Sequence, residues 1–258
     1  CKKIIMLPSS VQKHICELHE KKHRKIAGEF LIEGLKGVTE ALKSSYTVLA
    51  VVVDGARRDE KDMADCISLA EQKDVGVLFA GRADISRIKT TETFPGILAV
   101  VEMKTEEDAE PFGDIVIVLD AVADPGNLGT IIRTADWFGC SDIILGPGCV
   151  EPYNDKVVRS TMGSFFRVAL HESEDLERTL SELKDDGYDV QIADLHGKSV
   201  QDVPLKNKIA YVFGSESHGV QKNLLSLGTK ITIPGVEGAE SLNVAIAAGI
   251  VLFSNHIR

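Results

Sequence analysis

Several kinds of sequence signal are missing from this chain of 258 residues. No apolar run approaches the roughly 20 residues that a membrane-spanning helix needs, and the first residues lack the apolar core of a signal peptide. No G-x-G-x-x-G follows a predicted strand and no G-x-x-x-x-G-K-S/T occurs, which argues against a dinucleotide-dependent oxidoreductase and a P-loop enzyme. The five cysteines are an odd number without a C-x-x-C pair, as expected in a reducing cytoplasm. These absences predict a cytoplasmic globular protein that does not enter a membrane.

The net charge of −10 is spread unevenly along the chain. Residues 1–27 carry a net charge of +5, residues 28–112 carry −7 and the remainder carries −8. Screening limits the reach of a charge to about 10 Å at 0.1 M salt, so a basic arm can bind phosphates although the body is acidic. Lys22, Arg24 and Lys25 are therefore candidate phosphate contacts. The alternative is a solvated helix face.

Two α/β patterns are separated by the acidic stretch KTEEDAEPFG at 104–113, which contains Pro and Gly. We expect domains at 1–104 and 113–258. The first domain has short strand patterns between helical ones, which predicts a small α/β sandwich. Its expected strands are Phe30–Glu33, Thr47–Val53, Val75–Phe79 and Gly96–Val101, and its expected helices are Ser9–Lys22, Val38–Leu42 and Lys61–Gln72.

The second domain alternates near-continuous apolar strands with helical patterns. Strands that are apolar on both faces are typical of a parallel sheet covered by helices, and ligands bind such sheets at the carboxyl ends of the strands. The expected strands are Ile115–Leu119, Ile143–Leu145, Val168–Leu170, Val190–Ala193, Ala210–Phe213 and Ile231–Ile233. The expected helices are Leu128–Phe138, Asp155–Met162, Asp175–Lys184, Val220–Ser226 and Leu242–His256.

Three segments after strand ends are rich in Gly and small polar residues. DAVADPGNLGTIIRTA at 120–135 contains Asn127, which suits a helix N-cap, and Arg133, which needs a partner if it is buried among apolar neighbours. FGSESHG at 213–219 places Gly214 and Glu216 after a strand. ITIPGVEGAESLNVAIAAG at 231–249 has a Gly-rich loop, and Ser241 is expected to open the following helix.

Together these segments resemble the SpoU (TrmH-like) branch of the SPOUT RNA methyltransferases. The matching patterns are P-x-N-x-G with Arg six residues after the Asn, then G-x-E-x-x-G, then I-P-x-x-x-x-x-x-S-L-N-V, in this order. The stretch KHRKIAGEFLIEGLKGVTEAL at 22–42 is similar to the substrate-binding domain of many members, which looks like ribosomal-protein-like RNA-binding sandwiches. The resemblance therefore extends over nearly the whole chain.

The resemblance implies methylation of a ribose 2′-hydroxyl in RNA, with S-adenosylmethionine held in a bent form by a C-terminal trefoil knot. It places the cofactor at Leu195, Gly214, Ile233 and Leu242, and the characteristic polar positions at Asn127, Arg133, Glu216, Ser241 and Asn243. Members are homodimers whose subunits both shape the site, and no metal is required. Because a guanidinium keeps its proton up to about pH 12, we assign Arg133 to electrostatic organisation rather than to proton removal.

Several alternatives remain open from the sequence. The chain ends at Arg258 without a basic extension, which favours ribosomal RNA over transfer RNA as the substrate. A non-enzymatic RNA-binding protein that retains the fold is the second alternative. Cys16, His19 and His23 have a spacing at which they could share one helix face as metal ligands, although a structural zinc site normally shows four ligands.

Overall fold

A computed structural model describes residues 5–89, 93–105, 111–236, 238 and 240–257. Arg258 and the first four residues of the basic arm lie outside this range. Contacts divide the chain into unit 1, which is Cys1–Ala109 with Tyr153–Phe166, and unit 2, which is Glu110–Pro152 with Arg167–Arg258. The boundaries expected from the sequence stay a prediction, but Tyr153–Phe166 groups with unit 1 rather than with the second half of the chain.

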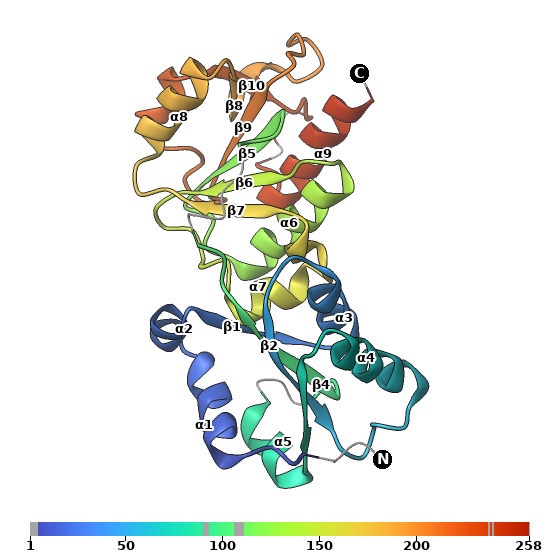
Figure 1. The fold of residues 1–258 in the computed structure, drawn as a ribbon. Helices are drawn as coiled ribbons and strands as arrows, with labels where there is room; N and C mark the ends of the chain where they lie inside the picture. The colour runs from blue at the N-terminus through green and yellow to red at the C-terminus, as the bar shows by residue number, and fades with distance from the viewer. Residues whose placement is uncertain (1–4, 90–92, 106–110, 237, 239, 258) are drawn as a thin grey trace. The chain divides into compact units, whose positions relative to one another are not determined.

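Unit 1 is built on a four-stranded sheet with the order β1-β4-β2-β3 (Figure 1). The strand β4 (Ile97–Glu102) is antiparallel to both of its neighbours, β1 (Glu29–Glu33) and β2 (Val48–Asp54). The edge strand β3 (Gly76–Ala80) is parallel to β2. The four strands match the expected strand patterns, and the mixed sheet is that of the predicted small sandwich.

The helices of unit 1 differ from the expected ones at two places. The expected helix Ser9–Lys22 is two helices, because Glu20 adopts an extended conformation between them. The short helix after β3 was not predicted, since its seven residues are too few for a clear period. The helices are α1 (Ser9–Leu18), α2 (Lys21–Ala27), α3 (Leu35–Lys43), α4 (Lys61–Gln72), α5 (Arg82–Ile88) and α7 (Asp155–Ser160).

Tyr153–Phe166 belongs to unit 1 because its aromatic residues pack on β1. Phe30 of β1 is fully buried, and its ring centroid lies 4.9 Å from that of Tyr153 and 5.4 Å from that of Phe165. An ion pair between Arg159 and Glu33, at 3.4 Å, joins α7 to the end of the same strand. Aromatic burial of this kind contributes several kcal/mol in total, so this segment is part of the unit 1 core.

Unit 2 contains a six-stranded sheet with the order β10-β8-β9-β5-β6-β7, in which every pair is parallel. The central strands are buried along most of their length, which confirms the parallel sheet predicted from their apolar runs. The strands are β5 (Ile115–Asp120), β6 (Asp142–Leu145), β7 (Ala169–Glu172), β8 (Asp189–Ser199), β9 (Ile209–Gly214) and β10 (Thr229–Thr232).

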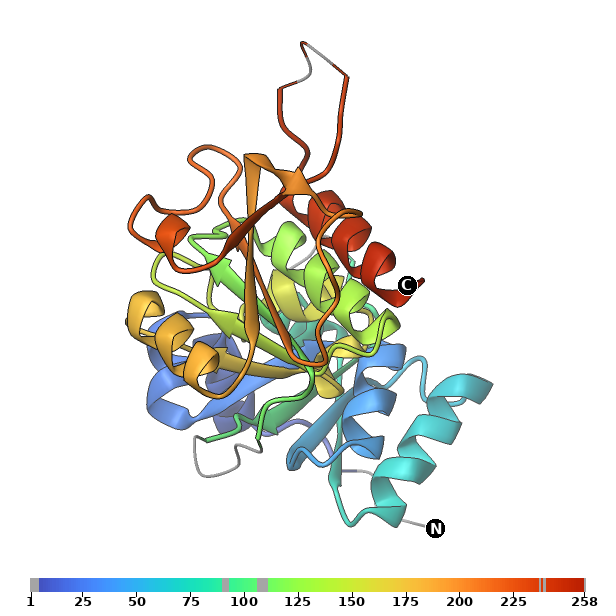
Figure 2. The same ribbon diagram turned by 90° about the horizontal axis from the view of Figure 1, so that it is seen from above.

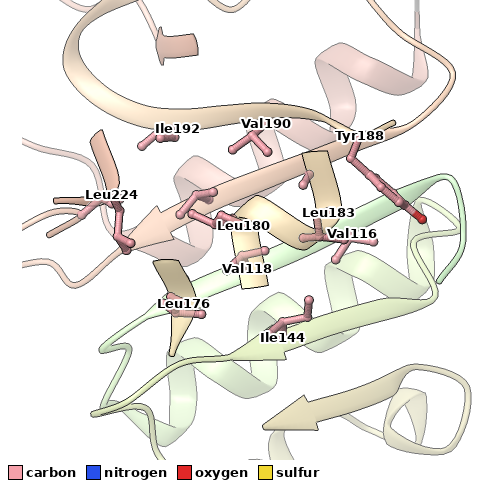
Figure 3. Close-up of a cluster of buried hydrophobic side chains, with 13 residues drawn as sticks. Val116, Val118, Ile144, Leu176, Leu180, Leu183, Tyr188, Val190, Ile192 and Leu224 are labelled. Atoms are coloured by element: carbon pink, nitrogen blue, oxygen red, sulfur yellow. The ribbon is translucent and has the colours of Figure 1, made fainter. Parts of the chain in front are cut away.

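Helices cover both faces of this sheet (Figures 1 and 2). The helices α6 (Pro125–Trp137) and α9 (Val244–His256) pack side by side on one face. On the other face, α8 (Leu176–Asp185) contributes Leu176, Leu180 and Leu183 to a cluster with Val116 and Val190 (Figure 3). Because helices cover both faces of the sheet, the strands of this unit are apolar on both sides.

The expected helix Val220–Ser226 is wrong: only Leu224–Ser226 forms a short 3₁₀ turn. The backbone N–H of Gln221 donates to a side chain of β5 instead of entering a helix. None of the helices in the described part of the chain is both long and apolar enough to span a bilayer. The trefoil knot implied by the family resemblance stays a prediction.

Candidate active site

Three polar side chains from distant segments of unit 2 are joined by hydrogen bonds. Asn127 Nδ2 donates to Glu216 Oε1, and Asn243 Nδ2 donates to Asn127 Oδ1 at 2.9 Å. We call Asn127, Glu216 and Asn243 the edge network. The segments meet because β5 and β9 are parallel neighbours with Asp120 opposite Gly214, so both following loops leave from the same edge. This is the edge at which α/β sheets bind ligands.

The sequence suggested Asn127 as the N-cap of α6, but the structure shows a different cap. The helix begins at Pro125, and its N-cap is Asp124, whose side chain accepts the backbone N–H of Asn127 at 2.9 Å. An Asp directly before a Pro in the first helical position is a known start signal, and it would have identified the true cap. Because Asp124 caps the helix, the Asn127 side chain in the first turn is left to bind Glu216 and Asn243.

The cap of α9 also differs from the expectation. The helix starts at Val244 and is capped by Asn243, whose Oδ1 accepts the backbone N–H of Ala245 at 3.0 Å and that of Ile246 at 3.3 Å. A side-chain amide both donates and accepts, so Asn243 can cap the helix and hold Asn127 at once. Ser241 is therefore not the cap; it is exposed two residues before Asn243.

Glu216 lies in a tight loop that follows β9. Gly219 N donates to Ser215 O at 2.9 Å, and the two residues form an isolated bridge. A Cβ atom on Gly214 would lie only 2.0 Å from the carbonyl carbon of Gly219, so no other residue fits there. The loop is therefore closed on itself, with Glu216 exposed at its turn.

The expected cofactor positions lie in loops at the same edge of the sheet. The pairing of β8 with β10 jumps from Ile192 to Lys198, so the chain between them leaves the ladder. Leu195 in this bulge is 67% exposed, and its carbonyl accepts from Thr232 Oγ1 at 3.4 Å, directly before Ile233. Leu242, which adjoins Asn243 of the edge network, is 47% exposed. The loops thus present apolar side chains beside polar groups.

Arg133 is exposed, which removes the argument that it needs a buried partner. Ile131 and Ile132 are fully buried, but the period of α6 turns Arg133 away from them. No hydrogen bond or salt bridge holds Arg133 among the residues that the structure describes. Trp137, one turn further, is 84% exposed. The structure therefore does not join Arg133 to the edge network within one chain.

Of the predicted RNA contacts in unit 1, Lys22 and Lys25 are exposed on α2 and Arg24 is not. Arg24 is 2% exposed, and its Nη1 donates to Leu18 O at 2.9 Å and His19 O at 2.8 Å. A guanidinium buried in this way fixes the turn between α1 and α2. The expectation that Arg24 contacts a phosphate is therefore corrected, since no exposed surface is left for it.

His19 has both ring nitrogens occupied. Nδ1 faces Asp155 Oδ2 at 2.9 Å, and Nε2 faces the carbonyl of Ile88 at 3.0 Å. Burial acts to lower the pKa of His19, but the hydrogen bond and charge of Asp155 and the Ile88 carbonyl outweigh it, so the pKa is raised above its usual value. Two acceptors favour an imidazolium, which has no lone pair for a metal, so the alternative site with Cys16 and His23 is not formed.

Comparison with known families places the two halves of the chain. Residues 114–253, more than half of the chain, match the SpoU rRNA Methylase family. The chain belongs to the SpoU rRNA methylase family. Residues 11–99 match the MRM3-like substrate binding domain, which accords with unit 1. The family resemblance inferred from the three motifs is thereby confirmed.

Individual SpoU family members resemble the chain over nearly its full length. The 23S rRNA (guanosine(2553)-2'-O)-methyltransferase RlmP of Bacillus subtilis is 36% identical over 247 residues, covering 94% of this chain and 93% of that protein. The 23S rRNA (guanosine-2'-O-)-methyltransferase RlmB of Ralstonia nicotianae is 28% identical, covering 86% and 93%. The structure of an AdoMet-bound rRNA methyltransferase from Sinorhizobium meliloti superposes with a TM-score of 0.84 at 29% identity, covering 98% and 96%.

Proposed function

We propose that this chain transfers a methyl group from S-adenosylmethionine to a ribose 2′-hydroxyl of RNA, with ribosomal RNA as the favoured substrate. The observation that carries the proposal is the edge network, in which hydrogen bonds join Asn127, Glu216 and Asn243. These residues come from the three family motifs. The relatives from Bacillus subtilis and Ralstonia nicotianae are both named as 23S rRNA 2'-O-methyltransferases, which supports the same chemistry here.

The loops beside the edge network fit an adenosyl group. Leu195, Val236 and Leu242 are all exposed large apolar side chains, and ligand sites typically combine apolar contacts with a few polar groups. Backbone groups near Gly214 and Ile233 would hold the polar atoms. The cofactor supplies an electrophilic methyl group on a sulfonium when bound. The related Sinorhizobium meliloti structure is AdoMet-bound, which supports this assignment.

The chain's own residues then position the acceptor. Glu216 presents a carboxylate that can accept the hydrogen bond of a ribose hydroxyl, and Asn127 fixes the carboxylate by donating to it. Asn243 fixes Asn127 in turn. The exposed Ser241 lies two residues before Asn243. Correct orientation of reacting groups can remove about 7–11 kcal/mol from a barrier, so we assign positioning of the hydroxyl as the main role of these residues.

The surface of α6 and α9 supports a homodimer. α9 carries a stripe of exposed apolar side chains at helical spacing, Ile246, Phe253 and Ile257, and Trp137 is exposed on the adjacent α6. Large contiguous apolar patches on a protein surface typically mark interaction sites, so several exposed apolar side chains on two packed helices favour a partner surface here. We propose that a second copy covers it. Arg133 is exposed on α6, and we propose that it reaches the edge network of the second copy and contacts the target nucleotide there.

For the substrate, the exposed Lys22 and Lys25 on α2 supply positive charge for RNA phosphates. We propose that these two lysines contact RNA, and that the protein acts in the cytoplasm, where ribosomal RNA is found. The alternatives are transfer RNA as substrate and RNA binding without turnover.

The test uses the 258-residue chain with labelled S-adenosylmethionine and two unmodified substrates, a 23S rRNA transcript and a pool of transfer RNA transcripts. We expect label in the ribosomal transcript, and mapping of 2′-O-methyl sites in RNA from a deletion strain should show one lost site. Transfer to the transfer RNA pool alone would replace the substrate assignment. Binding of RNA with no transfer to either transcript would favour the non-enzymatic alternative.

A further inference from the structure

Asp120, the last residue of β5, is a buried carboxylate that the proposed mechanism does not use. It is 1% exposed. Its Oδ2 accepts the backbone N–H of Gln221 at 2.7 Å, and its Oδ1 accepts the side-chain Nε2 of Gln221 at 2.6 Å. Burying a carboxylate costs free energy unless hydrogen bonds compensate for the lost water. An apolar residue at a purely structural position would avoid this cost.

The segment from Gly214 to Gln221, here called loop 214–221, is pinned to Asp120 at both ends. Gly214 leaves β9 directly opposite Asp120 in the β5–β9 register. After the closed turn at Ser215–Gly219, the chain returns and Gln221 binds both carboxylate oxygens. Asp120 is thus the common anchor of the loop that carries Glu216.

Asp120 is also the residue from which the Asn127 segment departs. Ala121 follows it with a left-handed backbone, at φ 56°, and α6 begins at Pro125. Glu216 and Asn127, which hydrogen-bond to each other, are therefore both attached to the sheet within a few residues of one carboxylate. A change at this anchor moves the two partners relative to each other.

We propose that Asp120 and Gln221 are positioning residues that fix loop 214–221 so that Glu216 meets Asn127 in the geometry the reaction needs. The inference rests on the proposed methyl transfer, and it assigns a role to two residues outside the three family motifs. A displacement of about 1 Å in a catalytic group can lower a rate about 100-fold. The pair therefore acts on turnover more than on the binding of RNA.

A reciprocal exchange tests the pair. Gln221→Glu places a carboxylate against the Asp120 carboxylate, so two acceptors face each other. Asp120→Asn is milder, because the Gln221 amide can turn its oxygen toward the new N–H and keep one hydrogen bond. The double variant Asp120→Asn with Gln221→Glu restores one donor facing one acceptor, while Asn Oδ1 keeps the backbone N–H of residue 221. The matched control is Gln191→Glu, because Gln191 Nε2 donates to Asp189 Oδ2 at 2.9 Å at the opposite end of the sheet.

For each variant, kcat, the KM values for S-adenosylmethionine and RNA, the melting temperature and amide hydrogen exchange of loop 214–221 are measured. We expect Gln221→Glu to lower kcat about 10- to 100-fold with little change in the KM for RNA, and to speed exchange in the loop. Asp120→Asn should have the smaller effect on both. The double variant should regain most of kcat and of the protection. Gln191→Glu should lower the melting temperature without either effect.

Wild-type kcat and loop protection in Gln221→Glu would overturn the inference, and so would a double variant as impaired as Gln221→Glu. If Asp120→Asn fails to fold, the test uses Gln221→Glu and Gln221→Ala, both of which keep the Asp120 carboxylate. Exchange in the loop should be faster, and kcat lower, in Gln221→Glu than in Gln221→Ala. If the wild type transfers no methyl group, the proposed function fails, whereas the exchange pattern still decides whether the pair anchors the loop.

Discussion

Units 1 and 2 both hold polar side chains in hydrogen-bond networks, but the two networks differ in burial. In unit 1, Arg24 is buried and His19 and Asp155 are largely so, and they bind one another or backbone carbonyls. In unit 2, Asn127 is half-buried and Glu216 and Asn243 are exposed, yet hydrogen bonds hold all three. A group that does chemistry has to be fixed and reachable at once, whereas a structural one only has to be satisfied. A hydrogen-bonded polar group that stays exposed, as in the edge network, is therefore the better candidate for contact with a substrate.

The largest effect is expected from removing the centre of the edge network. Asn127→Ala should lower methyl transfer roughly 100- to 1,000-fold, the loss typical for a preorganised hydrogen-bond donor, because Glu216 and Asn243 lose their common partner. Transfer of labelled methyl groups to ribosomal RNA under single-turnover conditions measures this. Thr130→Ala, an exposed position on the same helix, should retain activity. Equal rates for the two variants would show that methyl transfer does not depend on the edge network of unit 2.

Arg133 of unit 2 contrasts with the buried Arg24 of unit 1, because it is an exposed cation without a partner among the described residues. Arg133→Lys should reduce kcat roughly 10- to 150-fold, which corresponds to about 1.5–3 kcal/mol for a hydrogen bond to a charged group. Lysine keeps the charge but cannot reproduce the planar fork. Arg178→Lys, on the exposed face of α8, is the control. A wild-type rate for Arg133→Lys would show that the fork has no role.

The apolar stripe on α9 is a further difference between the units. Phe253→Asp should weaken a dimer at least about 30-fold, as expected for an interface residue that contributes about 2 kcal/mol. Sedimentation equilibrium measures the change. Ile26→Asp, at a 73% exposed apolar position of unit 1, should leave the association unchanged. A wild-type chain that stays monomeric at micromolar concentration would refute the dimer itself.

The smallest effect concerns the buried polar residues of unit 1. Because the folded pKa of His19 is raised above its ordinary value of 6.5, its contribution to stability is complete below that value and is lost as the pH rises through the folded pKa. Hydrogen exchange in α1 and α7 should therefore become faster, as the pH rises above 6.5, than base catalysis alone explains. His19→Gln should abolish this excess, while the half-exposed His23→Gln should not. An unchanged excess in His19→Gln would contradict the assignment.

The sequence predicted the elements better than it predicted their ends. Apolar runs revealed the parallel sheet because burial on both faces leaves a continuous signal, and the three motifs identified the residues of the edge network. The caps were misassigned at both helices: Asp124 and Asn243 take the places expected for Asn127 and Ser241. At α6 the Asp–Pro signal points to Asp124, whereas at α9 both Ser241 and Asn243 suit a cap and only the hydrogen bonds of Asn243 decide between them.

Other features had no local signal. Arg24 looks like any cation of a basic arm, and its burial follows from the extended Glu20 that turns α2 against α1. The anchor formed by Asp120 and Gln221 joins residues 101 positions apart, so no spacing rule could pair them. Likewise, Tyr153–Phe166 follows the chain of the second domain but packs with unit 1 through aromatic contacts that only the fold reveals.

The most direct measurement is the chemical position of the transferred methyl group. Alkali cleaves RNA through the free 2′-hydroxyl, so a 2′-O-methylated ribose survives in an alkali-stable dinucleotide, whereas a methylated base is released in a mononucleotide. After reaction of the wild-type chain with labelled S-adenosylmethionine and 23S rRNA, we expect the label in alkali-stable dinucleotides, and little label with Asn127→Ala. Label in mononucleotides, or equal labelling by the two proteins, would contradict a 2′-hydroxyl reaction organised by the edge network.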